Sequence, residues 1–203
     1  MSRDALGLAF VAAGYLFGSI PFGLIVARRL AGVDVRRAGS GNIGATNVAR
    51  TAGRLLGLLT LLLDVSKGAL PVAAAAFVLG GPGDPGPWAA ATGIAAFLGH
   101  VFPPWLRFHG GKGVATALGV FLALSPLSAL AAVAGFAAAF AASRIVSLGS
   151  LAGAASGAAA AALLHGRRSP VTWAAAAMLV GVVLRHRTNL ARLVRGEERR
   201  LGR

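Results

Sequence analysis

The stretch Gly99–Gly119 reads GHVFPPWLRFHGGKGVATALG and joins two apolar segments of the chain. Its centre is a glycine-rich tetrad, residues 110–113, in which Lys112 carries a positive charge. Glycines lack a Cβ, so consecutive backbone N–H groups can turn toward one anion, and the next helix adds the positive end of its dipole. The tetrad therefore predicts a phosphate site at a membrane surface. The alternative is a glycine-rich turn with a snorkelling lysine.

The composition indicates an integral membrane protein. Of the 203 residues, 56% are hydrophobic and 13% are charged, whereas soluble domains contain about a quarter charged residues. Several uncharged runs are long enough to cross the hydrocarbon core of a bilayer. We therefore expect a single transmembrane domain over residues 1–203, with the lipid bilayer as its surroundings.

The chain is strongly basic, with 20 lysines and arginines against 6 acidic residues and a net charge of +14. These basic residues lie in short loops between apolar runs, which is the positive-inside pattern of membrane proteins and not that of a nucleic-acid binder. The absence of cysteine excludes disulfides, thiolate metal sites and a cysteine acyl-enzyme.

The apolar runs predict an all-α, polytopic fold with seven transmembrane helices. Ser125-Pro126 is expected to divide residues 114–143 into two short helices. Arginines after the first run and seven arginines from Arg185 onward place the N-terminus outside and the C-terminus in the cytoplasm. The expected spans are Ala5–Ala27, Leu55–Leu79, Trp88–Trp105, the two helices within Val114–Ser143, Ile145–Leu164 and Val171–Leu184.

A second polar, glycine-rich loop precedes the second span and reads AGSGNIGATNVARTAGR over Ala38–Arg54. It places many side-chain hydrogen-bond donors beside arginines, which favours a second anion site over a capped turn. Within the second span, Asp64 and Lys67 are three residues apart and share a helix face. Charges inside a span face a polar interior, so a structural ion pair and a ligand role both remain open.

Some common catalytic and metal-binding arrangements of histidine are absent from the sequence. No histidine is followed by aspartate in the spacing His-x-x-x-x-Asp, and no histidine has a carboxylate at metal-ligand spacing. We expect neither a metal nor a cofactor. An acyl transfer would therefore depend on positioning and on stabilisation of the oxyanion. The rival function is a transporter or channel for an organic phosphate, but the internal repeats typical of transporters are not visible.

Four motifs together resemble the bacterial acyl-phosphate:glycerol-3-phosphate acyltransferase family. They are GSGNIGATNVAR (39–50), LDVSKG (63–68), GHVFPPWLRFHGGKGVAT (99–116) and RHRTNLARLVRGEE (185–198), in the order of the family. The resemblance implies a multi-pass enzyme of the bacterial inner membrane with its active site on the cytoplasmic side. Such an enzyme transfers a fatty acyl group from acyl phosphate to the sn-1 hydroxyl of glycerol 3-phosphate, giving lysophosphatidate and phosphate, which is the first acylation of phospholipid biosynthesis. A soluble enzyme that makes acyl phosphate is an expected partner.

The resemblance and the polar loops together define the candidate site residues. By resemblance, the catalytic residues are Ser40, Arg50, His186 and Asn189. The expected substrate-binding residues are Asn42, Asn47, Lys67, His100, Gly110, Gly111, Lys112, Gly113, Arg144 and Ser147. Glu198 and Asp64 are expected to be structural. In a mechanism like that of the family, the acceptor hydroxyl attacks the acyl carbonyl directly, the phosphate of the donor serves as the base, and His186 orients or stabilises.

Overall fold

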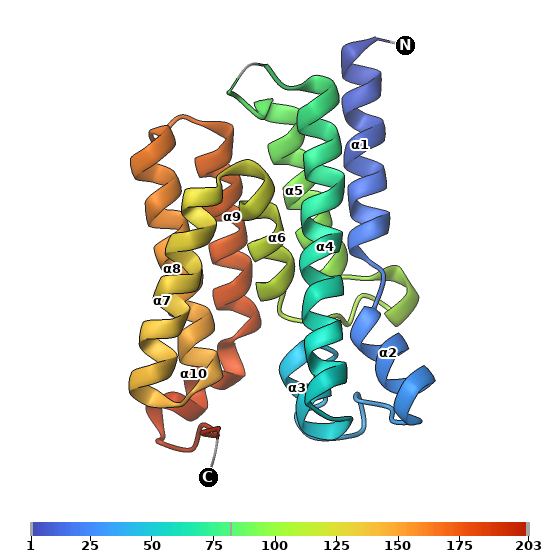
Figure 1. The fold of residues 1–203 in the computed structure, drawn as a ribbon, viewed down its shortest axis with the longest axis vertical. Helices are drawn as coiled ribbons and strands as arrows, with labels where there is room; N and C mark the ends of the chain where they lie inside the picture. The colour runs from blue at the N-terminus through green and yellow to red at the C-terminus, as the bar shows by residue number, and fades with distance from the viewer. Residues whose placement is uncertain (1, 82, 202–203) are drawn as a thin grey trace.

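The computed structural model describes residues 2–81 and 83–201, and within these ranges the chain is helical, without β-strands (Figure 1). A short 3₁₀ turn over Pro104–Leu106 precedes the glycine-rich tetrad. The helices are α1 (Arg3–Gly18), α2 (Phe22–Ala31), α3 (Ala45–Thr51), α4 (Arg54–Leu79), α5 (Gly86–Val101), α6 (Val114–Leu124), α7 (Pro126–Ser143), α8 (Val146–His165), α9 (Pro170–Arg185) and α10 (Arg187–Val194).

Five helical runs are long and apolar enough to cross a membrane, while α6 and α9 are apolar but shorter. At 1.5 Å per residue, the 26 residues of α4 reach about 39 Å, whereas the 11 residues of α6 reach about 17 Å. The all-α membrane fold is therefore confirmed, and the count of seven crossings stays a prediction. The predicted division of residues 114–143 is also confirmed, because α6 ends at Leu124 and α7 begins at Pro126.

The first apolar run, expected as one span over Ala5–Ala27, is divided into two helices next to Pro21. Helix α1 ends at Gly18 and α2 begins at Phe22, so the chain bends just before and at Pro21. Proline has no N–H to continue the helical ladder, and its ring restricts the preceding turn. Helix α2 consequently leaves the line of α1 near the lower end of the bundle in Figure 1.

Small residues allow the helices to approach closely. A Cβ added at Gly119 of α6 would collide with the backbone carbonyl of Val65 in α4, and one added at Gly153 of α8 would lie 2.7 Å from the carbonyl oxygen of Ala132 in α7. Lipid tails are as apolar as leucine, so helices associate in a membrane through such close packing. The glycines in α8 therefore allow α7 and α8 to pack closely.

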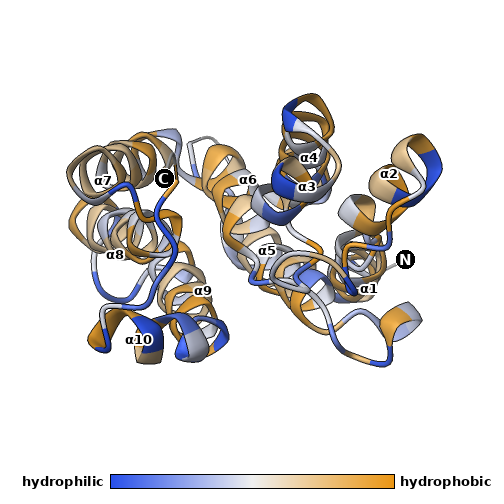
Figure 2. Cartoon of the chain, turned by 90° about the horizontal axis from the view of Figure 1, so that it is seen from below, coloured by the Kyte–Doolittle hydropathy of each residue, from blue (hydrophilic) through white to orange (hydrophobic). Residues whose placement is uncertain are grey.

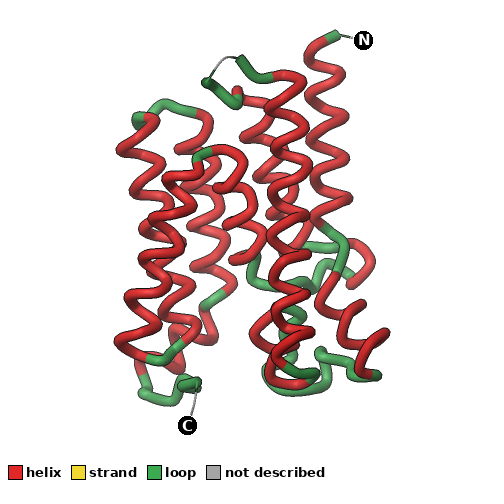
Figure 3. The backbone as a smooth tube through the Cα atoms, in the orientation of Figure 1, coloured by secondary structure: helices red, strands yellow, loops and turns green. Residues whose placement is uncertain are grey.

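The polar loops gather at one end of the bundle. Figure 2, seen from below, shows hydrophilic residues on α3, on α10 and along the C-terminal segment, with mostly apolar helices behind them. Figure 3 shows the loop that enters α6 on the same half of the molecule. Motifs far apart in the sequence therefore converge at the end opposite the N-terminus.

Candidate active site

A large cavity of about 1990 Å³ opens where these loops meet. Its polar wall comes from the loop before α3, the tetrad before α6, the α7–α8 junction and α10. Its apolar wall comes from α4, α6, α7 and α8, with side chains such as Leu58, Leu61, Phe121 and Phe136. One cavity thus combines cationic groups with an apolar wall.

Most of the residues predicted from the sequence line this cavity. They are Ser40, Asn42, Asn47, Arg50, Asp64, His100, Gly110, Lys112, Gly113, Arg144, Ser147, His186, Asn189 and Glu198. Gly111 and Lys67 were also predicted but do not line it. The structure therefore brings all four motifs to one site.

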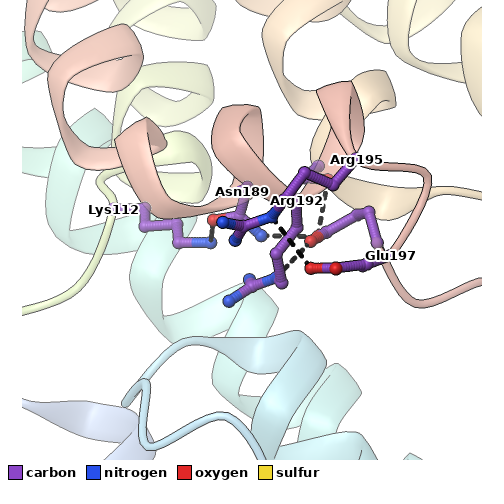
Figure 4. A network of polar contacts seen from close by, with 7 residues as sticks. Lys112, Asn189, Arg192, Arg195 and Glu197 are labelled. Atoms are coloured by element: carbon purple, nitrogen blue, oxygen red, sulfur yellow. Dashed lines mark hydrogen bonds and ion pairs between the residues drawn. The ribbon is translucent and has the colours of Figure 1, made fainter.

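Asn189 lies at the centre of a polar network on α10 (Figure 4). Its side-chain oxygen accepts a hydrogen bond from the Lys112 ammonium, and its Nδ2 donates to Glu198 Oε1 at 2.5 Å. Ser147 Oγ donates to the same Glu198 oxygen at 2.8 Å, and Arg192 Nε donates to Oε2 at 2.6 Å. The network therefore connects the tetrad, α8 and α10.

Glu198 is an ionised anchor of this network. Burial opposes its ionisation, but the hydrogen bonds from Arg192, Asn189 and Ser147 outweigh burial and lower its pKa. The neighbouring Glu197 forms an ion pair with the exposed Arg195, at 3.0 Å. The structure therefore gives the two consecutive acids different surroundings. The chain after Glu198 stays at the site, because the Leu201 N–H donates to the backbone oxygen of Arg144 at 2.8 Å.

Lys112 carries its charge in partly buried surroundings. Burial lowers its pKa to about 8, and the negative charge of Glu198 offsets only part of that effect. The amine is therefore mostly protonated at neutral pH. A bound phosphate would accept a charge-assisted hydrogen bond from it.

The backbone of the tetrad differs from the expected anion nest. The N–H groups of Gly110 and Gly111 donate to the carbonyls of Val101 and His100, both at 3.1 Å, and are not available to a ligand. The carbonyls of Gly110 and Gly111 accept from the Arg185 guanidinium at 2.9 and 3.1 Å. Sequence reasoning missed Arg185, although it opens the motif that also contains His186.

Glycine is required by backbone conformation at only one position of the tetrad. Gly113 has φ +80° and packs on the ring of Phe97, whereas Gly111 is not among the residues at positive φ. A residue with a side chain rarely adopts such a φ, so the backbone conformation at Gly113 requires glycine. At Gly111, glycine is required only because a Cβ would collide with its neighbours.

His186 is 2% exposed, and its Nδ1 lies 2.8 Å from the backbone oxygen of Val182. Nδ1 therefore carries the proton and Nε2 is the acceptor. Burial, together with the positive charge of Lys112, lowers the pKa of His186 to about 4. The imidazole is neutral near pH 7.

Asn47 organises the loop before α3. Its Nδ2 donates to the carbonyls of Val35, Ala38 and Asn42 at 2.8–3.0 Å, and its Oδ1 accepts from the Ser40 N–H at 2.8 Å. The amide thus holds the loop that presents Ser40 and Asn42. It was expected to bind substrate, but its hydrogen-bonding capacity is used within the protein.

The charged pair of the second span is an ion pair. Lys67 Nζ lies 2.8 Å from Asp64 Oδ1 and donates to the carbonyl of Ile20 at 2.8 Å, at the bend between α1 and α2. Both side chains are buried. The ion pair that the sequence left open is therefore formed. Lys67 does not line the cavity, although Asp64 does, and a ligand role for the pair stays a prediction. Across residues 2–81 and 83–201, no group of three or more His, Asp or Glu is placed to hold a metal ion.

Comparison with known proteins agrees with this geometry. The model of the family described as glycerol-3-phosphate acyltransferase matches residues 8–196. A glycerol-3-phosphate acyltransferase of Anaeromyxobacter dehalogenans (strain 2CP-1) is 53% identical over 201 residues, covering 99% of this chain and 100% of that protein. One of Myxococcus xanthus is 52% identical over 192 residues, covering 95% and 98%.

The fold is also that of a solved integral membrane enzyme. A crystal structure described as PlsY (YgiH), a glycerol 3-phosphate acyltransferase in its glycerol 3-phosphate form, superposes with a TM-score of 0.90 at 41% identity, covering 97% of this chain and 96% of that chain. Its lysophosphatidic acid form gives a TM-score of 0.88 at 40% identity, covering 97% and 95%. These likenesses extend over nearly the whole chain, so the protein belongs to the glycerol-3-phosphate acyltransferase family.

Proposed function

We propose that this chain transfers a fatty acyl group from acyl phosphate to the sn-1 hydroxyl of glycerol 3-phosphate, giving lysophosphatidate and phosphate. The observation that carries the proposal is the shared cavity, in which cationic groups meet an apolar wall between the helices. Both substrates carry a phosphate, and the donor and the product carry an acyl chain. Relatives solved in glycerol 3-phosphate and lysophosphatidic acid forms support the same reaction.

The polar end of the cavity attracts anions. Arg50, Lys112, Arg144 and Arg185 are all in its lining. Its two carboxylates are already engaged, Asp64 by Lys67 and Glu198 by three donors. The positive charges are therefore left to bind phosphate, with Lys112 as the contact to glycerol 3-phosphate.

The apolar wall orients the acyl chain more than it adds affinity. Leu58 and Leu61 of α4 line the cavity together with residues of α7 such as Val133 and Phe136. Lipid tails are about as apolar as these side chains, so moving an acyl chain from the bilayer to this wall gains little hydrophobic free energy. The wall instead directs the reactive carbonyl toward the polar end.

The acyl group passes directly from donor to acceptor. The chain has no cysteine, and the Ser147 hydroxyl donates to Glu198. A serine–histidine contact does occur in the described residues, between Ser125 and His165 at 2.9 Å, but neither residue lines the cavity. The site thus offers no hydroxyl activated by a histidine of the kind that nucleophilic catalysis uses.

In this mechanism the acceptor oxygen bonds to the acyl carbon, and the bond from that carbon to the phosphate oxygen breaks. The hydroxyl proton moves to the departing phosphate. Nearby cations stabilise the oxyanion. A pKa of about 4 makes His186 a weak base at neutral pH, so its Nε2 accepts a hydrogen bond that orients the hydroxyl.

The remaining candidate residues support this chemistry. We assign Ser40, Arg50 and Asn189 to substrate contact, together with Asn42, Arg144 and Ser147 at the rim. Asn47, Lys67, Gly110 and Gly111 hold the loops in place, which replaces the substrate contacts expected from the sequence. Glu198 and Asp64 keep the structural roles that were expected.

The same proposal includes the placement in the membrane. We infer seven crossings in a bacterial inner membrane, with the N-terminus outside and the cavity and C-terminus on the cytoplasmic side. Supporting this, α6 and α7 run in opposite directions in Figure 1, and the basic motifs gather at one end. A soluble enzyme that makes acyl phosphate would deliver it from that side.

A direct assay tests the reaction. Purified protein supplied with acyl phosphate and radiolabelled glycerol 3-phosphate should form labelled lysophosphatidate, while acyl-CoA or acyl carrier protein should be poor donors. Absence of product, combined with uptake of labelled glycerol 3-phosphate into vesicles containing the protein, would favour a transporter.

A further inference from the structure

His100 contacts the tetrad in two separate ways. It occupies the last turn of α5 and is 4% exposed. Its backbone oxygen accepts from the Gly111 N–H at 3.1 Å. Its ring lies directly against Gly111, and a Cβ added there would overlap Nε2. Both the main chain and the side chain of His100 therefore restrain the residue next to Lys112.

The opposite edge of the ring faces the buried ion pair. His100 Nδ1 lies 3.7 Å from Asp64 Oδ1, the oxygen that also pairs with Lys67. Among the described residues, the buried Nδ1 has no hydrogen-bond partner, whereas Asp64 Oδ1 is held by its ion pair with Lys67. A buried polar group without a hydrogen-bond partner costs stability. Stability alone therefore does not explain why a histidine is buried beside this ion pair.

The tetrad needs such support because glycines flank its lysine. Gly111 and Gly113 precede and follow Lys112, and glycine backbones visit many conformations when nothing restrains them. Arg185 restrains the loop from α9 by binding the carbonyls of Gly110 and Gly111. His100 restrains it from α5.

We propose that His100 is a positioning residue for acceptor binding: it fixes Gly111 so that the Lys112 ammonium faces the phosphate, and the Asp64–Lys67 pair holds the imidazole in place. The inference rests on the proposed function and deepens it. It replaces the direct substrate contact that the sequence suggested for His100.

The first test separates acceptor binding from chemistry. His100→Ala keeps the backbone bond to Gly111 but removes the ring that packs on it. It should raise the KM for glycerol 3-phosphate by about fivefold to tenfold, within the usual range for losing a buried contact. The KM for acyl phosphate should change little. His109→Ala is the matched control, because His109 is exposed, belongs to the same loop and does not line the cavity. Its acceptor KM should equal that of the wild type.

The second test uses the contact with Gly111. The three atoms nearest an added Cβ at Gly111 all belong to the His100 ring, and the φ of Gly111 suits an L residue. Gly111→Ala alone should therefore weaken acceptor binding by pushing the ring and the loop apart. With His100→Ala, the new methyl group fits the vacated space. The double variant should bind the acceptor more tightly than Gly111→Ala alone, a non-additive result.

Two further variants keep the test decisive if His100→Ala folds poorly. His100→Gln retains a planar side chain that can pack against Gly111 and should restore part of the acceptor affinity. Asp64→Asn combined with Lys67→Met removes the ion pair without leaving one charge buried alone, and should raise the acceptor KM in the same direction.

The outcomes distinguish the inference from the proposed function. An unchanged acceptor KM in folded His100→Ala, or additive losses in the double variant, would overturn the positioning role while wild-type synthesis of lysophosphatidate continued. If the wild type made no lysophosphatidate, the proposed function itself would fail. Rescue of Gly111→Ala by His100→Ala would support the role.

Discussion

The Lys112 ammonium donates a hydrogen bond to the side-chain oxygen of Asn189, a residue 77 positions further along the chain. Asn189 in turn donates to Glu198, which also binds Ser147 and Arg192. The charged side chain of the tetrad is therefore oriented by the C-terminal motif. A substitution in either motif should alter the position of side chains in the other.

Replacing Lys112 should chiefly weaken acceptor binding. Lys112→Ala removes a charge-assisted hydrogen bond, which contributes about 1.5–3 kcal/mol, or roughly ten- to hundredfold in affinity. Lys112→Arg keeps the charge but places a wider planar group between glycines, so it should restore only part of the activity. The measurement is the KM of each substrate side by side. An unchanged acceptor KM in folded Lys112→Ala would remove the tetrad from the acceptor site.

The two consecutive acids should behave differently. Glu198→Gln weakens three hydrogen bonds to a charged acceptor, so we expect a loss of stability of about 1–3 kcal/mol and a large loss of activity. Glu197→Gln is the matched control, and it should change stability by less than about 0.5 kcal/mol because its pair with Arg195 is exposed. Thermal unfolding in detergent and the acceptor kcat/KM measure both effects. Equal losses in the two variants would contradict the distinction.

The acceptor kcat/KM should fall as the pH rises above about 8. Lys112 binds phosphate when protonated, and its pKa of about 8 in the free enzyme means that the charge is present below that pH and lost above it. His186, with a pKa of about 4, should add no inflection between pH 5 and 8. Lys112→Arg remains charged throughout this range, so its alkaline decline should disappear. An alkaline decline at the same pH in Lys112→Arg would assign it to another group.

No acyl chain should become attached to the protein during turnover. The chain lacks cysteine, and no histidine contacts a serine hydroxyl within the described cavity wall. Intact-protein mass spectrometry after rapid acid quenching should therefore show the unmodified mass. A mass increase equal to one acyl group, lost on addition of glycerol 3-phosphate, would establish a covalent intermediate instead.

The two ends of the bundle should face opposite sides of the membrane. Because the chain contains no cysteine, single cysteines at Gly83 and Gly196 can be labelled without background. Gly83 lies between α4 and α5, and Gly196 follows α10. An impermeant thiol reagent added to intact cells should label Gly83→Cys and not Gly196→Cys. Labelling of both from outside would contradict an odd number of crossings.

The class of fold and the residue types of the site can be predicted from the sequence alone. Apolar runs, the Ser125-Pro126 break and the loop arginines are local properties, so they predicted the all-α membrane fold and the boundary between α6 and α7. The polar motifs likewise contain the residue types that an anion site needs, and most of them line one cavity.

Helix packing sets which atoms of those motifs are free to face a ligand, and this could not be predicted from the sequence. The Asn47 amide, the Lys67 ammonium and the N–H groups of Gly110 and Gly111 are all able to bind anions, but each is used by a protein carbonyl or carboxylate instead. Arg185 binds the carbonyls of the tetrad only because the end of α9 lies beside it. The type of a residue and its place in a motif show which hydrogen bonds and ion pairs it can form. The partner that uses this capacity is set by helix packing, which brings together groups distant in the chain.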